Sequence, residues 1–177
     1  MLALELYNKE CKDTLGGIKE FYISPYKKWT RSQISVLDMD LVSIPTDSFY
    51  TYKCVGTYTQ DSNLENGAVY FNQNIEIKLP KVYGLINGLT FTKQLYRIIV
   101  KTNNNQYIIF GTYNGLEAKL NNASGSGKNE FNGFTLSFTG KEKDTGYLIT
   151  NLEDANIILL DSEYLTDLLN NDLDTDL

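Results

Sequence analysis

A short segment of this sequence brings cationic and aromatic side chains together. Residues 24–31 read SPYKKWTR, and their rings and cations are Tyr26, Lys27, Lys28, Trp29 and Arg31. Such a mixture can bind single-stranded nucleic acid or sugars. It is also enriched at contacts between protein subunits. Because no second basic cluster accompanies the segment, we favour a subunit contact or ordinary surface over a ligand site.

Residues suited to catalysis are scarce by comparison. Histidine is absent, which removes the usual general base at neutral pH, the usual zinc ligand and every Ser-His or Cys-His nucleophile pair. The chain has 22 acidic residues, but no pair of them falls in a recognisable catalytic motif. We therefore predict that the protein is not an enzyme and needs no cofactor or metal.

Two short motifs resemble binding loops but lack essential residues. SGSGK, at residues 124–128, would need Gly at position 122 and Ser or Thr at position 129 to form a phosphate loop, and both positions are Asn. DLDTDL, at residues 172–177, has the alternating acids of a calcium loop without its turn glycine and distal glutamate. We interpret the first as a loop and the second as a solvated acidic segment.

The length and composition are those of a β-rich globular domain. The chain has 177 residues, of which 42% are hydrophobic and 21% charged, and its 13 Tyr and 8 Phe favour strands. It contains no apolar run long enough for a transmembrane helix and no basic start typical of a signal peptide. We therefore expect its two cysteines, Cys11 and Cys54, to be reduced thiols of a cytosolic product, while their spacing leaves a disulfide open.

Charge is unevenly distributed along the chain. The net charge is −6, yet residues 151–177 contain eight acids and no base, which leaves residues 1–150 with a charge of +2. We predict a β domain over residues 1–160 and an acidic C-terminal extension over residues 161–177. Neither part has the concentrated basic face of a nucleic-acid-binding protein.

Alternation of apolar and polar residues predicts several strands. The clearest is Val69 to Leu79, which ends at Pro80. Segments 94–101 and 106–110 flank an Asn-rich turn and predict a hairpin. Further strands are predicted at residues 134–139 and, from weaker patterns, at residues 18–23, 33–37, 49–58 and 155–160. The residues that we expect in the core are Phe71, Ile75, Ile77, Leu136 and Phe138.

Two segments depart from the strand pattern. Residues 79–94 predict a short helix or a broken loop. Residues 161–170 predict a helix, because Asp161 or Ser162 can cap it and its leucines Leu165, Leu168 and Leu169 share one face. That face can pack on the chain's own core or on a neighbouring subunit. Since its many acids repel one another, we expect the extension to need an apolar groove or a basic surface, which a neighbour supplies better than the nearly neutral body.

Two segments resemble bacteriophage virion proteins of the tail-tube or tail-ring kind. GGIKEFYI, residues 16–23, resembles the N-terminal strand of such proteins from crAss-like and related phages. FNGFTLSFTGKEKDTGYLI, residues 131–149, resembles their later strand and the turn after it. Between them, the strand VYFNQNIEIKLPK and the segment 84–94 stand in the expected order. The resemblance covers about residues 11–150, and the part after Asn151 has no counterpart.

The resemblance implies an antiparallel β-sandwich or barrel of the tail-tube type with one short inserted helix. It implies a structural subunit of a cyclic ring, six- or twelve-fold, that lines the DNA-ejection channel in the tail of the virion after synthesis in the host cytoplasm. The implied partners are copies of the same chain and adjacent tail or portal proteins, with DNA only in transit and no membrane. On this interpretation the Gly16-Gly17 pair releases the first strand toward a neighbour's sheet. The interface residues expected are Ile18, Phe21, Tyr26, Trp29, Leu165, Leu168 and Leu169.

Two other functions remain open from the residues. The abundant Tyr and the single Trp29 are compatible with a carbohydrate- or receptor-binding β-module of a phage tail. A carboxylate-dependent hydrolase is the least favoured, because the acids show no catalytic spacing.

Overall fold

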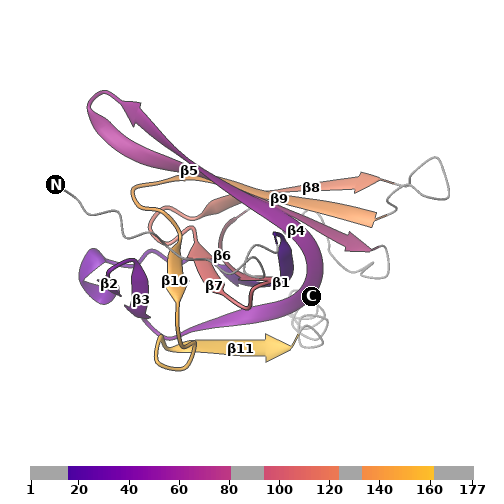
Figure 1. Ribbon diagram of the computed structural model, residues 1–177, viewed down its shortest axis with the longest axis horizontal. Helices are drawn as coiled ribbons and strands as arrows, with labels where there is room; N and C mark the ends of the chain where they lie inside the picture. The colour runs from indigo at the N-terminus through magenta and orange to yellow at the C-terminus, as the bar shows by residue number, and fades with distance from the viewer. Residues whose placement is uncertain (1–15, 81–93, 124–132, 162–177) are drawn as a thin grey trace, which may run out of the picture.

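Most of the described chain belongs to one large mixed sheet. The computed structural model describes residues 16–80, 94–123 and 133–161, and the chain within them is mainly β, as predicted (Figure 1). One short 3-10 helix, η1 (Arg31–Gln33), interrupts the strands. The strands are β1 (Ile18–Pro25), β2 (Ser35–Leu37), β3 (Asp40–Ser43), β4 (Asp47–Glu65), β5 (Ala68–Pro80), β6 (Leu95–Thr102), β7 (Tyr107–Phe110), β8 (Leu116–Ala123), β9 (Gly133–Glu142), β10 (Tyr147–Ile149) and β11 (Ile157–Asp161).

Six of these strands pair in a closed circuit. The antiparallel neighbours run β1, β4, β5, β9, β8, β6 and back to β1. The circuit closes through a short contact in which Leu95 and Tyr96 of β6 face Glu117 and Leu116 of β8. Its interior is filled by the first of two hydrophobic cores. The buried residues of this core are Ile18, Phe21, Ile23, Tyr52, Ile75, Ile77, Leu79, Tyr96, Ile98, Val100, Ile108, Phe110, Leu116, Leu136 and Phe138.

A second core lies on the opposite face of β1 and β6. The sheet continues from β6 through β7, β10, β3 and β2, and these strands curl beside the closed circuit (Figure 1). Tyr22 and Ile99 point into this second core while their neighbours along the chain point into the first. The buried residues of the second core are Tyr22, Trp29, Ile34, Leu41, Ile44, Phe49, Ile99, Ile109, Tyr147, Ile149, Ala155 and Ile157.

Strands that are buried on both faces have the continuous apolar runs expected of them. Residues 21–23, 98–100 and 108–110 read FYI, IIV and IIF, and each run divides its side chains between the two cores. A strand with only one buried face alternates apolar and polar residues instead. The runs therefore identify β1, β6 and β7 as strands whose side chains enter both cores.

Most strand predictions are confirmed. The hairpin over residues 94–110 forms as β6 and β7, and the strands predicted at 18–23, 49–58, 69–79 and 134–139 form as β1, β4, β5 and β9. The strand predicted at 155–160 is wrong at its start, because residues 155 and 156 lie in a turn and β11 begins at Ile157. The prediction at 33–37 is wrong at its start, because Gln33 ends η1 and β2 begins at Ser35. Strands β3, β8 and β10 were not predicted.

The prediction of an antiparallel sandwich or barrel is confirmed only in part, because six antiparallel strands close a circuit but the sheet as a whole is mixed. β11 pairs with β4 in parallel, from Ile157 opposite Asp47 to Asp161 opposite Thr51, and β10 meets β3 in parallel through Leu148 and Asp40. Both pairings join segments far apart in sequence that lie on unused strand edges. The described residues form one sheet curled around two cores, so they do not divide into the two stacked sheets of a sandwich.

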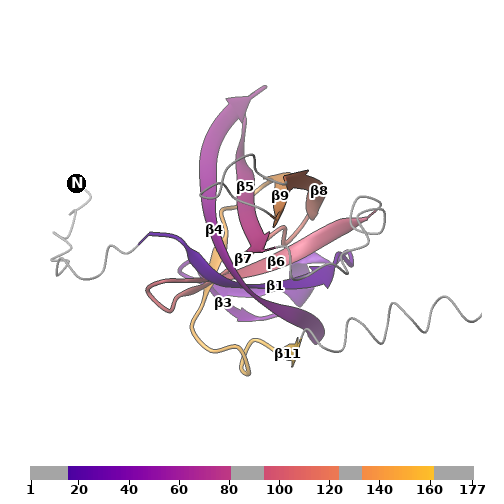
Figure 2. The ribbon, with the colours of Figure 1, turned by 90° about the vertical axis from the view of Figure 1, so that its right-hand side faces the viewer.

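The β4–β5 hairpin extends beyond the body as an arm, which we define as residues 61–72. Apart from Phe71 and Asn72, which pair with the end of β9, it projects past the other strands at the upper left of Figure 1 and at the top of Figure 2. Its turn is Asn66-Gly67, with φ of 52° and 80°, the left-handed pair that a two-residue hairpin turn requires. Within the described ranges, β4 pairs with β1 only as far as Gly56, so its outer edge is open from there to the turn.

The arm explains the one incorrect member of the predicted core. Ile75, Ile77, Leu136 and Phe138 are fully buried, as predicted. Phe71 is only half-buried and Val69 is exposed, although both lie on the same face of β5 as Ile75. The alternation correctly predicts which side chains of β5 share a face, but β5 extends beyond the part of the body that covers this face.

The remaining sequence predictions fall outside the described residues. These are the inserted helix near residues 84–94, the loop predicted from SGSGK at residues 124–128 and the C-terminal helix with Leu165, Leu168 and Leu169. In the part of the chain that the structure describes, no helix is long and apolar enough to cross a membrane.

Candidate interaction site

The predicted interface residues of the first strand lie in the protein's own core. Ile18 and Phe21 are 2% and 1% exposed, and both belong to the first hydrophobic core. Strand β1 is paired along one edge with β4 and along the other with β6. The expectation that β1 leaves the body to join a neighbour's sheet is therefore not what this fold shows, because both of its edges are already used.

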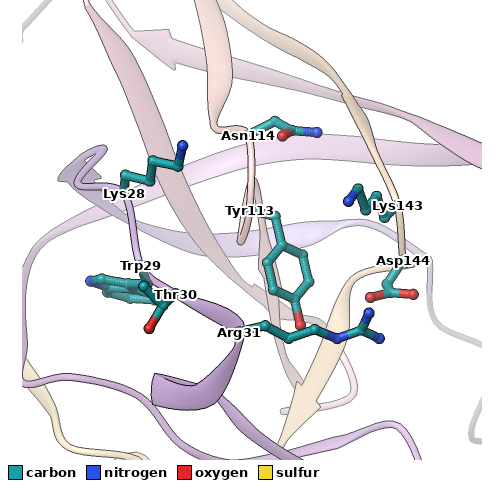
Figure 3. Close-up of a pocket in the computed structure, with 8 residues that line it drawn as sticks. All are labelled: Lys28, Trp29, Thr30, Arg31, Tyr113, Asn114, Lys143 and Asp144. Carbon is teal, nitrogen blue, oxygen red and sulfur yellow. The ribbon is translucent and has the colours of Figure 1, made fainter.

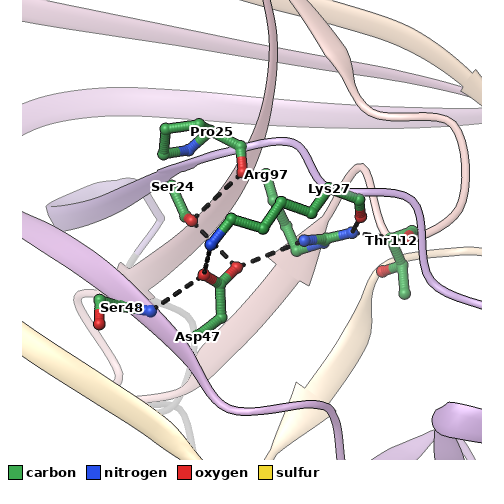
Figure 4. A network of polar contacts seen from close by, with 7 residues as sticks. All are labelled: Ser24, Pro25, Lys27, Asp47, Ser48, Arg97 and Thr112. Atoms are coloured by element: carbon green, nitrogen blue, oxygen red, sulfur yellow. Dashed lines mark hydrogen bonds and ion pairs between the residues drawn. The ribbon is translucent and has the colours of Figure 1, made fainter.

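The segment after β1 is organised by a buried arginine. Arg97 of β6 is 0% exposed, and its Nη1 lies 3.4 Å from Oδ2 of Asp47 (Figure 4). Its Nη2 donates hydrogen bonds to the carbonyl oxygens of Lys27 at 2.9 Å and Thr112 at 3.2 Å. Asp47 also accepts a hydrogen bond from Ser24 at 3.0 Å. The network joins the 24–31 segment to the starts of β4 and β6.

Arg97 also positions both aromatic rings of the segment. Its guanidinium carbon lies 3.2 Å from the ring centroid of Trp29 and 5.1 Å from that of Tyr26. Burial lowers the pKa of Arg97 to about 10, although the nearby charge of Asp47 opposes the shift. The side chain therefore remains a cation at neutral pH, and it holds Trp29 by a cation–π contact rather than by apolar packing alone.

A buried carboxylate fixes the turn opposite this segment. Glu142, at the end of β9, accepts hydrogen bonds from the backbone N–H groups of Tyr113, Asn114 and Gly115 at 2.8 to 3.2 Å. Burial raises the pKa of Glu142, and these hydrogen bonds together with the charge of Arg97 oppose the rise. Residues 113–115 are thus held by one side chain from a distant strand.

Between the 24–31 segment and this turn lies a hollow of about 360 Å³ (Figure 3). Three chain segments contribute its walls, and in Figure 3 the ring of Tyr113 stands in the middle of them. We call it the basic hollow, because three of its eight residues are cationic. The lining residues are Lys28, Trp29, Thr30, Arg31, Tyr113, Asn114, Lys143 and Asp144.

The cations of the basic hollow are uncompensated in the described part of the chain. Lys28, Arg31 and Lys143 are exposed, and none forms an ion pair with a described residue. The single acid, Asp144, accepts a hydrogen bond from the hydroxyl of Tyr147 at 2.8 Å. The lining therefore carries two positive charges more than it carries negative charges. An anionic group is the ligand that this balance favours.

The geometry of the hollow is less suited to sugar stacking. Trp29 is only 8% exposed, because one face of its ring is covered by Arg97. Tyr113 is half-buried, and its hydroxyl lies 3.3 Å from that of Tyr147. No wide aromatic face is therefore presented to a ligand at this site.

Groups suited to metal binding or nucleophilic chemistry do not gather elsewhere on the described residues. No cluster of three or more His, Cys, Asp and Glu side chains is arranged there to hold a metal ion. Burial raises the pKa of the Cys54 thiol to about 12, so the thiolate that reacts as a nucleophile is rare at neutral pH.

The structure assembles a site that sequence reasoning found only in part. Of the predicted residues, Trp29 lines the hollow and Tyr26 does not, and the rings of both contact Arg97. The residues that were missed are Tyr113, Asn114, Lys143 and Asp144, which come from the β7–β8 and β9–β10 connections. The sequence signals for them were the turn-forming pair Asn114-Gly115 and the group of charged and turn-forming residues KEKDTG at 141–146.

Comparisons with known proteins identify no relative. The chain matches no protein-family model, and searches of curated proteins and of solved structures return no similar protein.

Proposed function

We propose that this protein is a structural subunit of a ring or tube in a bacteriophage tail. The assignment to a phage rests on the resemblance of segments 16–23 and 131–149 to tail-tube and tail-ring proteins. The assignment to an assembly rests on one observation, the projecting arm. The arm has an open strand edge and an uncovered apolar face, and both are features that a second chain can complete.

The open edge is the first of these features. β4 carries no described partner on its outer edge beyond Gly56, and residues 57–65 read TYTQDSNLE. Proteins commonly protect such edges with Lys, Pro or a bulge. This stretch has no Lys or Pro, so its unpaired N–H and C=O groups form a template for strand addition.

The apolar face is the second feature. Leu64 and Val69 lie directly opposite each other across the hairpin and are 73% and 56% exposed. Phe71 continues the same face toward the body. A two-stranded ribbon is at best marginally stable in water without a surface to pack on. Contact with a neighbouring copy would cover this face and stabilise the arm.

The finer parts of the proposal follow from the resemblance. They are a fold of the tail-tube type, a six- or twelve-fold ring around the DNA-ejection channel, a position in the virion tail and contacts with adjacent tail or portal proteins. DNA passes through the lumen without being held. We further propose that the chain acts without catalysis, cofactor or membrane.

The test is the size of the assembly that the full chain forms. We expect light scattering to give the mass of a closed ring and electron microscopy to show its rotational symmetry. The double variant Leu64→Ser with Val69→Ser should shift the protein toward single chains, and its unfolding midpoint should equal that of wild-type single chains measured at high dilution. A matched control is Val55→Ser, which removes another exposed apolar side chain from β4 within the body.

Two outcomes would contradict the proposal. A wild-type chain that remains single at all accessible concentrations would exclude self-assembly. Equal effects of the control and the double variant would show that the arm is not the contact. The alternative of a carbohydrate- or receptor-binding module predicts a small oligomer and is the less supported, because Trp29 is covered by Arg97.

A further inference from the structure

We infer that the basic hollow is the docking site for the acidic segment 162–177 of a neighbouring copy of this chain. The inference rests on the proposed assembly and adds to it the contact that joins one subunit to the next. Its support comes from the charges of the hollow, the charges of the segment and the direction in which the chain leaves β11.

The hollow supplies the receptor. Lys28 and Arg31 approach it from the segment after β1, and Lys143 approaches from the turn after β9 (Figure 3). The backbone N–H of Thr30 donates a hydrogen bond to Gln33 Oε1 at 2.9 Å, which fixes the turn that carries Arg31. On the opposite wall, Glu142 holds the turn that carries Tyr113 and Asn114. The walls are therefore fixed, and only the long cationic side chains must adjust to a ligand.

The segment supplies the matching charges. Residues 162–177 contain five acids, Glu163, Asp167, Asp172, Asp174 and Asp176, and no base. The hollow carries three cations that the described residues leave unpaired. A surface of opposite charge attracts such a run of acids, and complementary potentials of this kind guide a partner into register.

The direction of β11 favours a neighbour's hollow over the chain's own. β11 begins opposite Asp47, whose carboxylate belongs to the Arg97 network beside the hollow. It ends at Asp161 opposite Thr51, four residues further along β4 and thus roughly 13 Å away. The chain is therefore heading away from its own hollow where segment 162–177 begins. Docking on its own hollow would require the chain to reverse after β11, whereas docking on another copy carries no such requirement.

Cross-linking between isotopically distinct chains tests the contact. Full-length unlabelled and nitrogen-15-labelled chains are mixed as single chains, concentrated, and treated with a carbodiimide that joins Lys amines to carboxylates within contact distance. We expect peptides that link Lys28 or Lys143 to residues 163–176, with one heavy and one light partner. Links with two heavy or two light partners only would place the segment on its own hollow. Links only to other lysines, or none from the segment, would exclude the contact, and each of these results overturns the inference.

A binding measurement tests the charges separately. A fluorescent peptide of residues 162–177 is titrated with the full-length chain, and its anisotropy is recorded. The variant Lys28→Gln with Arg31→Gln and Lys143→Gln should bind it about tenfold more weakly, as expected for the loss of three exposed ion pairs. The control variant Lys53→Gln, Lys78→Gln and Lys119→Gln removes the same charge from exposed lysines elsewhere and should bind as wild type does. Equal weakening by both variants would reduce the effect to net charge and overturn the inference.

The experiments separate failure of this docking contact from failure of the proposed ring assembly. Rings that form without these cross-links leave the proposed function standing and remove the inference. If the sample contains only single chains, the proposed function is wrong, and no neighbouring copy exists to bind the segment. A single-stranded oligonucleotide that binds through the three cations, while the acidic peptide does not, would assign the hollow to nucleic acid and overturn the inference.

Discussion

The body of the protein and its arm share two strands but are stabilised by opposite means. Ile75 and Ile77 of β5 are 0% exposed, because β9 pairs with β5 and the first core packs against its inner face. Val69, earlier on the same strand and the same face, is 56% exposed. The two ends of one regular strand therefore differ in burial, although their backbone conformation and residue types are alike.

The boundary between body and arm is marked by two glutamines. Gln60 and Gln73 face each other across the hairpin. Gln60 accepts a hydrogen bond from the N–H of Gly146 at 2.7 Å, and Gln73 accepts one from the N–H of Gly111 at 3.0 Å. On the arm side of this pair, within the described residues, the apolar face has no covering layer. The arm therefore has the same strand pairing and apolar face as the body, but it lacks the layer of side chains that covers this face in the body.

The largest expected change in the free energy of unfolding comes from removing a buried charge of the body, compared with removing an exposed charge of the arm. Asp47→Asn removes the charge that faces Arg97, and loss of one member of a buried pair should lower the free energy of unfolding by about 3–5 kcal/mol. Asp61→Asn makes the same change at an exposed position of the arm and should cost less than about 0.5 kcal/mol. Urea unfolding of both variants measures the difference. Similar small shifts at both positions would mean that the Arg97 network does not stabilise the body.

The next effect compares two apolar residues on one face of β5. Ile77→Ala should lower the free energy of unfolding by about 2–5 kcal/mol, since it opens a cavity in the first core. Val69→Ala should change it by less than about 0.5 kcal/mol, since the side chain is exposed. Thermal and urea unfolding report both values. A large loss from Val69→Ala in the single chain would show that the arm packs on its own body after all.

The smallest effect concerns pH at the base of the arm, where Glu142 pairs with Phe71 of β5. Because burial raises the pKa of Glu142 above its ordinary value of 4.5, the folded chain binds this proton more tightly than the unfolded chain does. The stability that the group contributes is therefore complete below pH 4.5 and is lost as the pH rises through the raised pKa.

Glu142→Gln should remove this dependence. We expect the wild type to lose stability relative to the variant as the pH rises from 4.5, with a constant difference once the carboxyl is ionised. Urea unfolding across the pH series provides the comparison, and any change in the turn hydrogen bonds appears as an offset that does not depend on pH. A relative gain by the wild type with rising pH would contradict the direction of the pKa shift.

Local patterns in the sequence determined the strands and their faces. Side chains alternate along a strand, so the spacing of Ile75, Ile77, Leu136 and Phe138 was enough to place them on a buried face. The hairpin of β6 and β7 follows from an Asn-rich turn between two β-rich runs. The Asn66-Gly67 turn is readable in the same way, because only a few residue types tolerate its positive φ angles.

Only the tertiary structure decided which parts of those faces are covered and which distant segments meet. Phe71 satisfies the same alternation as Ile75, and its half-exposure depends on where the body ends, which no local pattern encodes. The parallel pairing of β11 with β4 joins residues about a hundred positions apart. The basic hollow likewise needs three separate segments. One segment supplies Lys28 and Arg31. Arg97 and Glu142 hold the other two segments, with Tyr113 and Lys143, opposite it. Alternation acts between neighbours in sequence, whereas burial and charge clustering act between neighbours in space.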